Sequence, residues 1–170
     1  MGPTFPHYGP AGWQNLLLYG DRNVARGIAL RACIKEGRAG GKALYMQQRM
    51  ITIDDSAFRS SGGSENVVLG VFDSLGEVAN LISNIRPSVA VIDPANGATG
   101  RWGAHRRLAL DLFEIATAAD RIHVRLILLC EMTEWNGTSR LRHYATIRKF
   151  CDQELEVSAD PLAKGDKLNG

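Results

Sequence analysis

Short apolar segments that alternate with helix-length segments constrain this chain more than any other feature. Three segments have apolar residues at helical spacing, namely Val24–Glu36, Ser74–Ile85 and His105–Arg121. Strands that alternate with helices form a mainly parallel sheet covered by helices on both faces, and so the sequence predicts a single α/β domain. The predicted strands are Asn15–Tyr19, Lys42–Gln47, Val67–Phe72, Ser88–Asp93, Val124–Met132 and Glu154–Asp160.

Length and composition favour one soluble, cytosolic domain. The chain has 170 residues, which suits a single hydrophobic core. We expect an extended arm over residues 1–14, rich in proline, glycine and aromatic residues, a domain over 15–160 and a polar tail over 161–170. Because no apolar run approaches the roughly 20 residues of a membrane span, we expect no membrane partner.

Cysteine and charge usage exclude several classes of site. The three cysteines are widely separated and have no metal-ligand spacing, so we expect buried free thiols, neither a disulfide framework nor a metal site. The net charge of +2 is too small to indicate a nucleic-acid partner by itself. Only local clusters of basic residues can do so.

The segment GDRNVARG, from Gly20 to Gly27, follows the first predicted strand directly and leads into the first predicted helix. A glycine between a strand and a helix is where nucleotide-binding proteins place a phosphate loop. The segment lacks the Gly-Lys-Ser/Thr ending of such loops. It is therefore either a phosphate site or the remains of one.

The order of these segments resembles the core of the RecA-like ATPases, nearest to the RadA and DnaB branch. The resemblance covers roughly Asn15 to Asp160 and depends on order, spacing and apolar pattern together, because no single motif is intact. The segments that carry it are NLLLYGDRNVARGIALRACI, GGKALYMQQ, LISNIRPSVAVID, VRLILLCEMTEWNG and TSRLRHYATIRKFCDQELEVSAD.

The resemblance implies a vestigial nucleotide site. In the family's phosphate loop, Gly20 takes the place of the first glycine, Ala25 the second, Arg26 the lysine and Gly27 the hydroxyl residue, so three of four positions are altered. Gly27 offers no metal ligand, and a forked guanidinium replaces a compact ammonium poorly. Asp93 matches the carboxylate that orients the metal, although a strand-end aspartate can equally cap the following turn.

The resemblance also implies that the ATPase chemistry has decayed. The family's catalytic carboxylate lies at the end of the second strand, where this chain has Gln47 and Gln48, and an amide cannot accept a proton from water. Glu131 stands where the family senses the terminal phosphate, and a carboxylate there repels it. We therefore assign no catalytic residue and expect no cofactor, with Mg-ATP as the less favoured alternative.

Two segments have the composition of a single-strand binding surface, since cations contact phosphates and aromatic rings stack on bases. The resemblance implies that each segment follows a strand which, in the RecA family, precedes a DNA-binding loop. The alternative is structural: the arginines belong to a solvated helix start, and the tryptophans are core or subunit-interface anchors. The candidate residues are Arg101, Trp102, His105, Arg106 and Arg107 in the first segment, and Trp135, Arg140, Arg142 and His143 in the second.

Three hypotheses follow from these residues. The leading one is a degenerate RecA-like protein that binds single-stranded nucleic acid or a related ATPase in replication or recombination. It does not turn over ATP itself, and we expect it to assemble as a homo-oligomer. The second is a structural or inhibitory protein-interaction module that docks through its N-terminal arm. The third is an atypical NTPase whose site a partner completes, with Arg26 and Asp93 still holding nucleotide.

Overall fold

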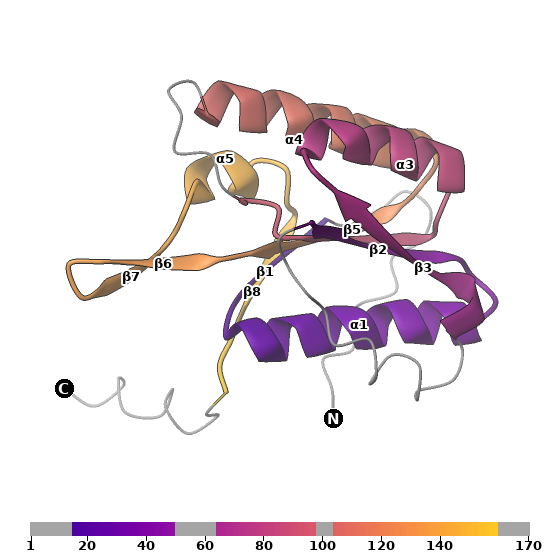
Figure 1. Ribbon diagram of the computed structural model, residues 1–170, viewed down its shortest axis with the longest axis horizontal. Helices are drawn as coiled ribbons and strands as arrows, with labels where there is room; N and C mark the ends of the chain where they lie inside the picture. Colours follow the sequence, from indigo (N-terminus) through magenta and orange to yellow (C-terminus); the bar gives the residue numbers. More distant parts are fainter. Residues whose placement is uncertain (1–14, 50–63, 98–103, 160–170) are drawn as a thin grey trace.

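A six-stranded sheet organises the computed structural model, which describes residues 15–49, 64–97 and 104–159. The strand order is β3-β2-β4-β5-β1-β8, and every neighbouring pair of strands is parallel (Figure 1). The α/β class predicted from the alternation of segments is confirmed. The strands are β1 (Leu16–Gly20), β2 (Ala43–Gln48), β3 (Val67–Phe72), β4 (Val89–Asp93), β5 (Arg125–Cys130) and β8 (Gln153–Val157).

Helices cover both faces of the sheet. Among the described residues, helix α1 (Arg22–Arg38) covers one face, whereas α3 (Val78–Ile85), α4 (Ala104–Arg121) and α5 (Tyr144–Arg148) lie on the other (Figure 1). Single 3-10 turns, Ser64–Asn66 and Leu75–Glu77, precede β3 and α3. None of the described helices is long and apolar enough to cross a bilayer.

The core consists of two apolar layers because successive strand residues point to opposite faces. On β1, Leu17 belongs to the layer under α3 and α4, while Leu16 and Leu18 belong to the layer over α1. The central strands are buried on both faces, as in other parallel sheets. Cys33, Cys130 and Cys151 are free and buried in these layers, as expected.

Strand order brings the candidate nucleotide residues together. Strand β5 pairs with β1 on one side and with β4 on the other. The carboxyl ends of β1, β5 and β4 therefore lie next to one another, with Gly20, Glu131 and Asp93 at or just beyond them. This edge is where open parallel sheets bind ligands.

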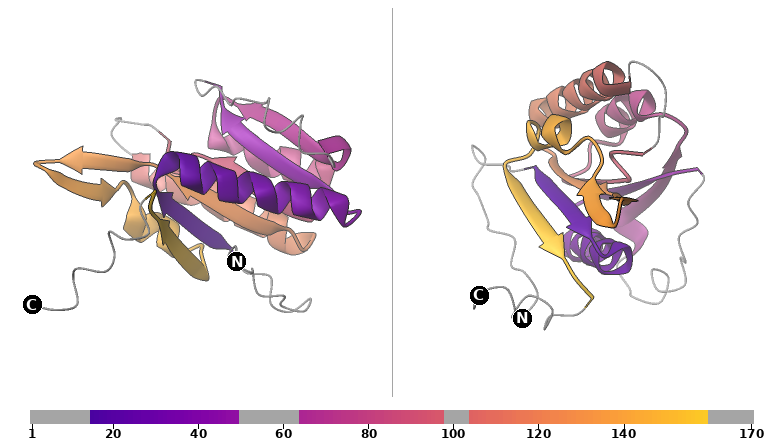
Figure 2. Two further views of the ribbon diagram at one scale, coloured as in Figure 1. Left: turned by 90° about the horizontal axis from the view of Figure 1, so that it is seen from below. Right: turned by 90° about the vertical axis from the view of Figure 1, so that its left-hand side faces the viewer.

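The segment after β5 differs from the prediction. We expected one strand over Val124–Met132, but β5 ends at Cys130, and β6 (Met132–Trp135) pairs antiparallel with β7 (Thr138–Leu141). Asn136 and Gly137 form the tight turn with φ of 51° and 73°, as a type I′ hairpin turn requires. This hairpin projects well beyond the sheet (Figures 1 and 2).

The remaining differences are at element ends and in one additional short helix. The helix expected from Val24 begins two residues earlier, at Arg22, and the last strand spans Gln153–Val157 rather than continuing to Asp160. The short helix α5 was not expected. The predicted N-terminal arm, the polar tail, Arg101 and Trp102 lie outside the described residues.

Candidate functional site

The junction between β1 and α1 leaves little room for a phosphate loop. Gly20 ends the strand, Asp21 is the N-cap, and the helix begins at Arg22. The Asp21 carboxylate Oδ1 accepts a hydrogen bond from the Val24 backbone N–H at 2.9 Å, as an N-cap side chain does. Arg26 and Gly27 consequently lie within the helix, and the residues of GDRNVARG do not form an open loop around a phosphate-sized space.

Gly20 has a structural role in the sheet. Its φ is 114°, and a Cβ built on it lies 2.1 Å from the carbonyl oxygen of Val157. The Asp21 backbone N–H donates a 2.9 Å hydrogen bond to that same oxygen. Because any other residue would push β8 away from β1, glycine is required here whether or not a phosphate binds.

Asp93 is buried and pairs with two side chains. It is 2% exposed and lies at the end of β4. Arg26 Nε lies 2.7 Å from Asp93 Oδ2, and Arg26 Nη2 lies 3.4 Å from Oδ1. The Tyr45 hydroxyl donates a 2.9 Å hydrogen bond to Oδ2. Burial, together with the Asp93 carboxylate, raises the pKa of Tyr45, so this hydroxyl stays a donor. The Arg26 guanidinium therefore offsets the charge of the buried Asp93 carboxylate.

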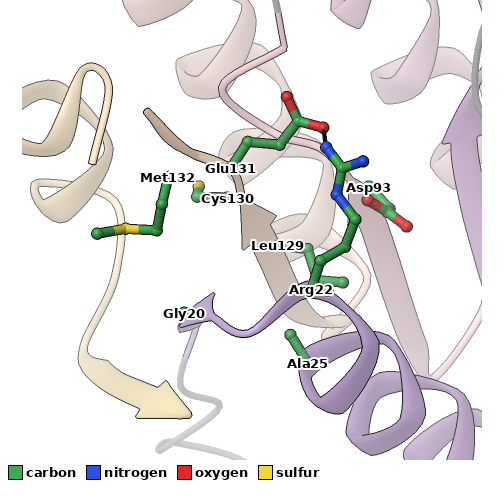
Figure 3. Close-up of a pocket in the computed structure, with 8 residues that line it drawn as sticks. All are labelled: Gly20, Arg22, Ala25, Asp93, Leu129, Cys130, Glu131 and Met132. Atoms are coloured by element: carbon green, nitrogen blue, oxygen red, sulfur yellow. Dashed lines mark hydrogen bonds and ion pairs between the residues drawn. The ribbon is translucent and has the colours of Figure 1, made fainter. Parts of the chain in front are cut away.

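A cavity of about 190 Å³ lies beyond the carboxyl ends of β1, β4 and β5 (Figure 3). The Arg22 side chain extends across it to form an ion pair with Glu131. Both carboxylates of the cavity thus already have a guanidinium partner in this structure. The lining residues are Gly20, Arg22, Ala25, Asp93, Leu129, Cys130, Glu131 and Met132.

Asn96 connects the cavity to the hairpin. Its side chain is 3% exposed, and its Oδ1 accepts a 2.8 Å hydrogen bond from the Glu131 backbone N–H. Its Nδ2 donates to the carbonyl oxygens of Glu131 and Arg142 at 2.9 and 3.2 Å. One buried amide therefore holds both ends of the segment that contains β6 and β7. Sequence reasoning missed this residue, as it missed Tyr45 and the Arg22–Glu131 pair.

The β6–β7 hairpin presents an aromatic and basic face. Trp135 pairs with Thr138, and Thr133 pairs with Arg140. Because side chains alternate between the two faces of a strand, Trp135 and Arg140 lie on one face, at diagonal positions within reach of each other. Trp135 is 68% exposed, and Arg140 is also exposed. The predicted alternative of a core tryptophan is therefore wrong for Trp135.

His105 and His143 bring the two candidate segments into contact. Their Nδ1 atoms lie 3.0 Å apart, and the rings meet edge to face with centroids 4.5 Å apart. Partial burial lowers the pKa of His143 below its ordinary value, and the neighbouring His105 and Arg142 lower it further. The start of α4 is thus joined to the start of α5 at the base of the hairpin.

The remaining candidate arginines have different surroundings. Arg106 and Arg142 are exposed, and Arg107 Nε forms a 3.0 Å ion pair with Asp111 Oδ1 one turn along α4. Pairing one turn apart fits the solvated-helix alternative for Arg107. The structure thus gathers His105, Arg106, Arg142 and His143 near the hairpin base, with Arg26 and Asp93 in a separate buried cluster.

Comparison with known proteins adds no family to this description. No protein-family model matches the chain, and no curated protein matches its sequence. The geometry shows a parallel α/β domain with a cavity at the carboxyl ends of its central strands. The RecA-like relationship and both candidate sites stay predictions.

Proposed function

We propose that this chain is a catalytically degenerate RecA-like protein that binds single-stranded nucleic acid without hydrolysing ATP, in replication or recombination. The observation that carries the proposal is the exposed face of the β6–β7 hairpin, where Trp135 and Arg140 lie side by side. An aromatic ring stacks on any base, and an adjacent guanidinium contacts the phosphate backbone.

The basic residues near the hairpin base extend this surface. Asn96 holds the Arg142 backbone, and His143 contacts His105 at the start of α4. Arg106 follows His105 and is exposed. A strand that stacks on Trp135 meets further cations as it continues from the hairpin toward α4. Such a track suits a flexible single strand better than a compact ligand.

The buried cluster supports the absence of ATP turnover. A magnesium-nucleotide site needs a carboxylate free to orient the metal and a cation free to reach the phosphates. Here Arg26 and Asp93 are bonded to each other, and the Tyr45 hydroxyl occupies a further lone pair of Asp93. Nucleotide binding would require this cluster to separate. The helical conformation of Arg22 to Gly27 adds to that cost.

The strand order supports the RecA-like part of the proposal. The resemblance implies that the strand before the loop, the strand that ends in Asp93 and the strand that precedes Glu131 serve one site. In the sheet, β5 separates β1 from β4, so that all three strands end around one cavity. A crevice of this kind is where open parallel sheets bind ligands.

Fluorescence anisotropy of labelled single-stranded DNA, titrated with the protein at stepped salt with and without Mg-ATP, tests the proposal. We expect binding that weakens steeply with salt, because each phosphate contact releases counterions, and that does not respond to ATP. Tighter binding with ATP would instead favour an atypical NTPase.

Matched variants locate the surface. Trp135→Ala and Arg140→Ala should each weaken binding, with loss of stacking corresponding to about 1–3 kcal/mol per base. Ser139→Ala is the control, because Ser139 pairs with Glu134 on the opposite face of the hairpin. Equal affinities of all three variants and the wild type would exclude the hairpin face.

Exposure of Trp135 also favours a second candidate, a structural or inhibitory module that docks on another protein, such as a related ATPase. Tryptophan is enriched among residues that dominate protein interfaces. Absence of DNA binding at any salt concentration would favour this candidate. The hairpin would then be the docking element, and Trp135→Ala would weaken capture of the protein partner.

A further inference from the structure

The outer side of α4 has an exposed apolar patch that the proposed function does not use. Leu110 and Phe113 are 59% and 61% exposed, one helical turn apart. The helix already buries a different side against the core, through Leu108, Leu112, Ile115 and Ala119. Figure 1 shows α4 in the helical layer above the sheet, away from the hairpin tip. Two large apolar side chains on the solvent side of an otherwise amphipathic helix indicate an interaction surface.

Exposed charges flank the patch in a specific arrangement. At 3.6 residues per turn, Arg106 lies almost in line with Leu110 and Phe113 along the helix axis, Asp120 lies on one side of that stripe, and Arg107, Glu114 and Arg121 lie on the other. Arg106 and Arg107 are in the first turn of α4, and Glu114 and Asp120 lie nearer its C-terminus, although the exposed Arg121 in the last turn departs from this separation. Arginines at a helix N-terminus oppose the helix dipole, so helix stability does not account for this arrangement.

We propose that α4 pairs with α4 of a second copy of this chain, antiparallel, across a two-fold axis between Leu110 and Phe113. Leu110 of each copy then packs on Phe113 of the other. The same operation places Arg106 near Asp120 of the second copy and Arg107 near Glu114. Arg107 reaches this carboxylate while remaining close to Asp111.

Charge complementarity selects this partner and this orientation. Reversing the helix direction brings Arg106 against Asp120 and Arg107 against Glu114, so these four charges each meet an opposite charge, while Arg121 in the last turn takes no part in the pairing. A parallel arrangement would place arginine against arginine and carboxylate against carboxylate. A two-fold interface uses the same patch on both subunits, and a patch that complements itself is what such symmetry requires.

Sedimentation equilibrium of the purified full chain tests the pairing. We expect a reversible dimer. Leu110→Ser with Phe113→Ser should yield monomer, whereas Val71→Thr should not, because Val71 is a similarly exposed apolar residue on β3, outside the patch. A wild-type chain that stays monomeric, or a dimer unaffected by the double serine variant, would overturn the proposal.

Charge reversal tests the orientation. Arg106→Asp and Asp120→Arg should each weaken the dimer about tenfold or more, because each creates two like-charge contacts. Both changes agree with the helix dipole, so neither should unfold α4, and thermal melting followed by circular dichroism checks this. The double variant Arg106→Asp/Asp120→Arg should restore the dimer. Failure of the double variant to recover would exclude the antiparallel register.

Discussion

The ionic cluster around Asp93 and the β6–β7 hairpin have similar kinds of residues in opposite environments. In the cluster, Arg26 and Tyr45 both bond to one carboxylate in the interior. On the hairpin, Trp135 and Arg140 are exposed on a ribbon that projects beyond the sheet. Polar groups that satisfy one another stabilise the fold, whereas exposed groups are available to a ligand.

This difference changes the interpretation of the GDRNVARG segment. Its position after a strand suggests recognition of a phosphate, but Gly20 packs against the Val157 backbone and Arg26 pairs with Asp93 in this fold. We therefore expect substitutions in the cluster to change the stability of the domain, and substitutions on the hairpin to change binding alone.

Asp93→Ala should have the largest effect on stability. It leaves Arg26 partly buried without its partner and removes the acceptor of the Tyr45 hydroxyl. Breaking one partner of a buried pair costs several kcal/mol, and since Arg26 can turn toward water we expect a loss of about 3 kcal/mol in the free energy of unfolding. Urea unfolding followed by circular dichroism measures it.

Tyr45→Phe is the companion variant for the cluster. It removes one hydroxyl and leaves the Arg26–Asp93 ion pair, so we expect a smaller loss of about 1 kcal/mol. If Asp93→Ala were to cost no more than Tyr45→Phe, the ion pair would contribute nothing to stability, and the cluster would be better explained as a site kept for a ligand.

The two glycines of GDRNVARG should respond in opposite directions. Gly20→Ala places a Cβ against the Val157 carbonyl and strains a φ of 114°, which we expect to cost about 2 kcal/mol. Gly27→Ala lies in the helix, where the nearest atom to the new Cβ is Arg31 Nη1 at 3.5 Å, and should stabilise by about 0.5–1 kcal/mol. Thermal melting of both variants gives the comparison.

A destabilised Gly27→Ala protein would contradict the helical assignment of this segment. It would indicate that Gly27 needs a conformation that alanine avoids, as a true phosphate loop does. The pair of variants therefore separates a structural glycine from a glycine retained for nucleotide.

The sheet could be predicted from the sequence because each central strand is a continuous apolar run. The central strand Val89–Asp93 differs from its prediction by one residue, and the edge strand Val67–Phe72, which is largely exposed, matches its prediction at both ends. The central runs become strands because only burial on both faces removes their side chains from water. The site was harder to predict, because Asn96 and Tyr45 act through contacts between segments distant in sequence.

The hairpin was missed although its signal was present. Asn136-Gly137 is a preferred type I′ turn sequence, and Met132 to Trp135 precedes it directly. The apolar run of β5 continues into Met132, so that one long strand appeared sufficient. Only the Asn96 amide, which bonds to the Glu131 backbone, shows why the chain leaves the sheet at that point.

Acidification should weaken the contact between His105 and His143. The pKa of His143 is lowered from its ordinary value of 6.5, so the unfolded chain binds more protons just below that value. The contribution of neutral His143 to stability is complete above the unfolded pKa and is lost as the pH falls toward the folded pKa. The free energy of unfolding should therefore decrease as the pH falls below about 6.5 toward the lowered pKa of the folded state.

His143→Asn should reduce this pH dependence, because asparagine tolerates the φ of 59° and does not titrate. His123→Asn is the matched control, since His123 has a φ of 58° and lies outside the ring pair. Equal pH dependence of both variants would remove the histidine pair as the cause.

Trp135→Ala should have the smallest effect on stability and a large effect on binding. The side chain is 68% exposed at the end of the hairpin, so its removal should change the free energy of unfolding by no more than about 0.5 kcal/mol. Urea unfolding and DNA anisotropy on the same preparation separate the two effects. A loss of stability comparable to that of Tyr45→Phe would mean that the ring packs on the domain. The hairpin would then resemble the ionic cluster, and the distinction between a structural and a binding region would fail.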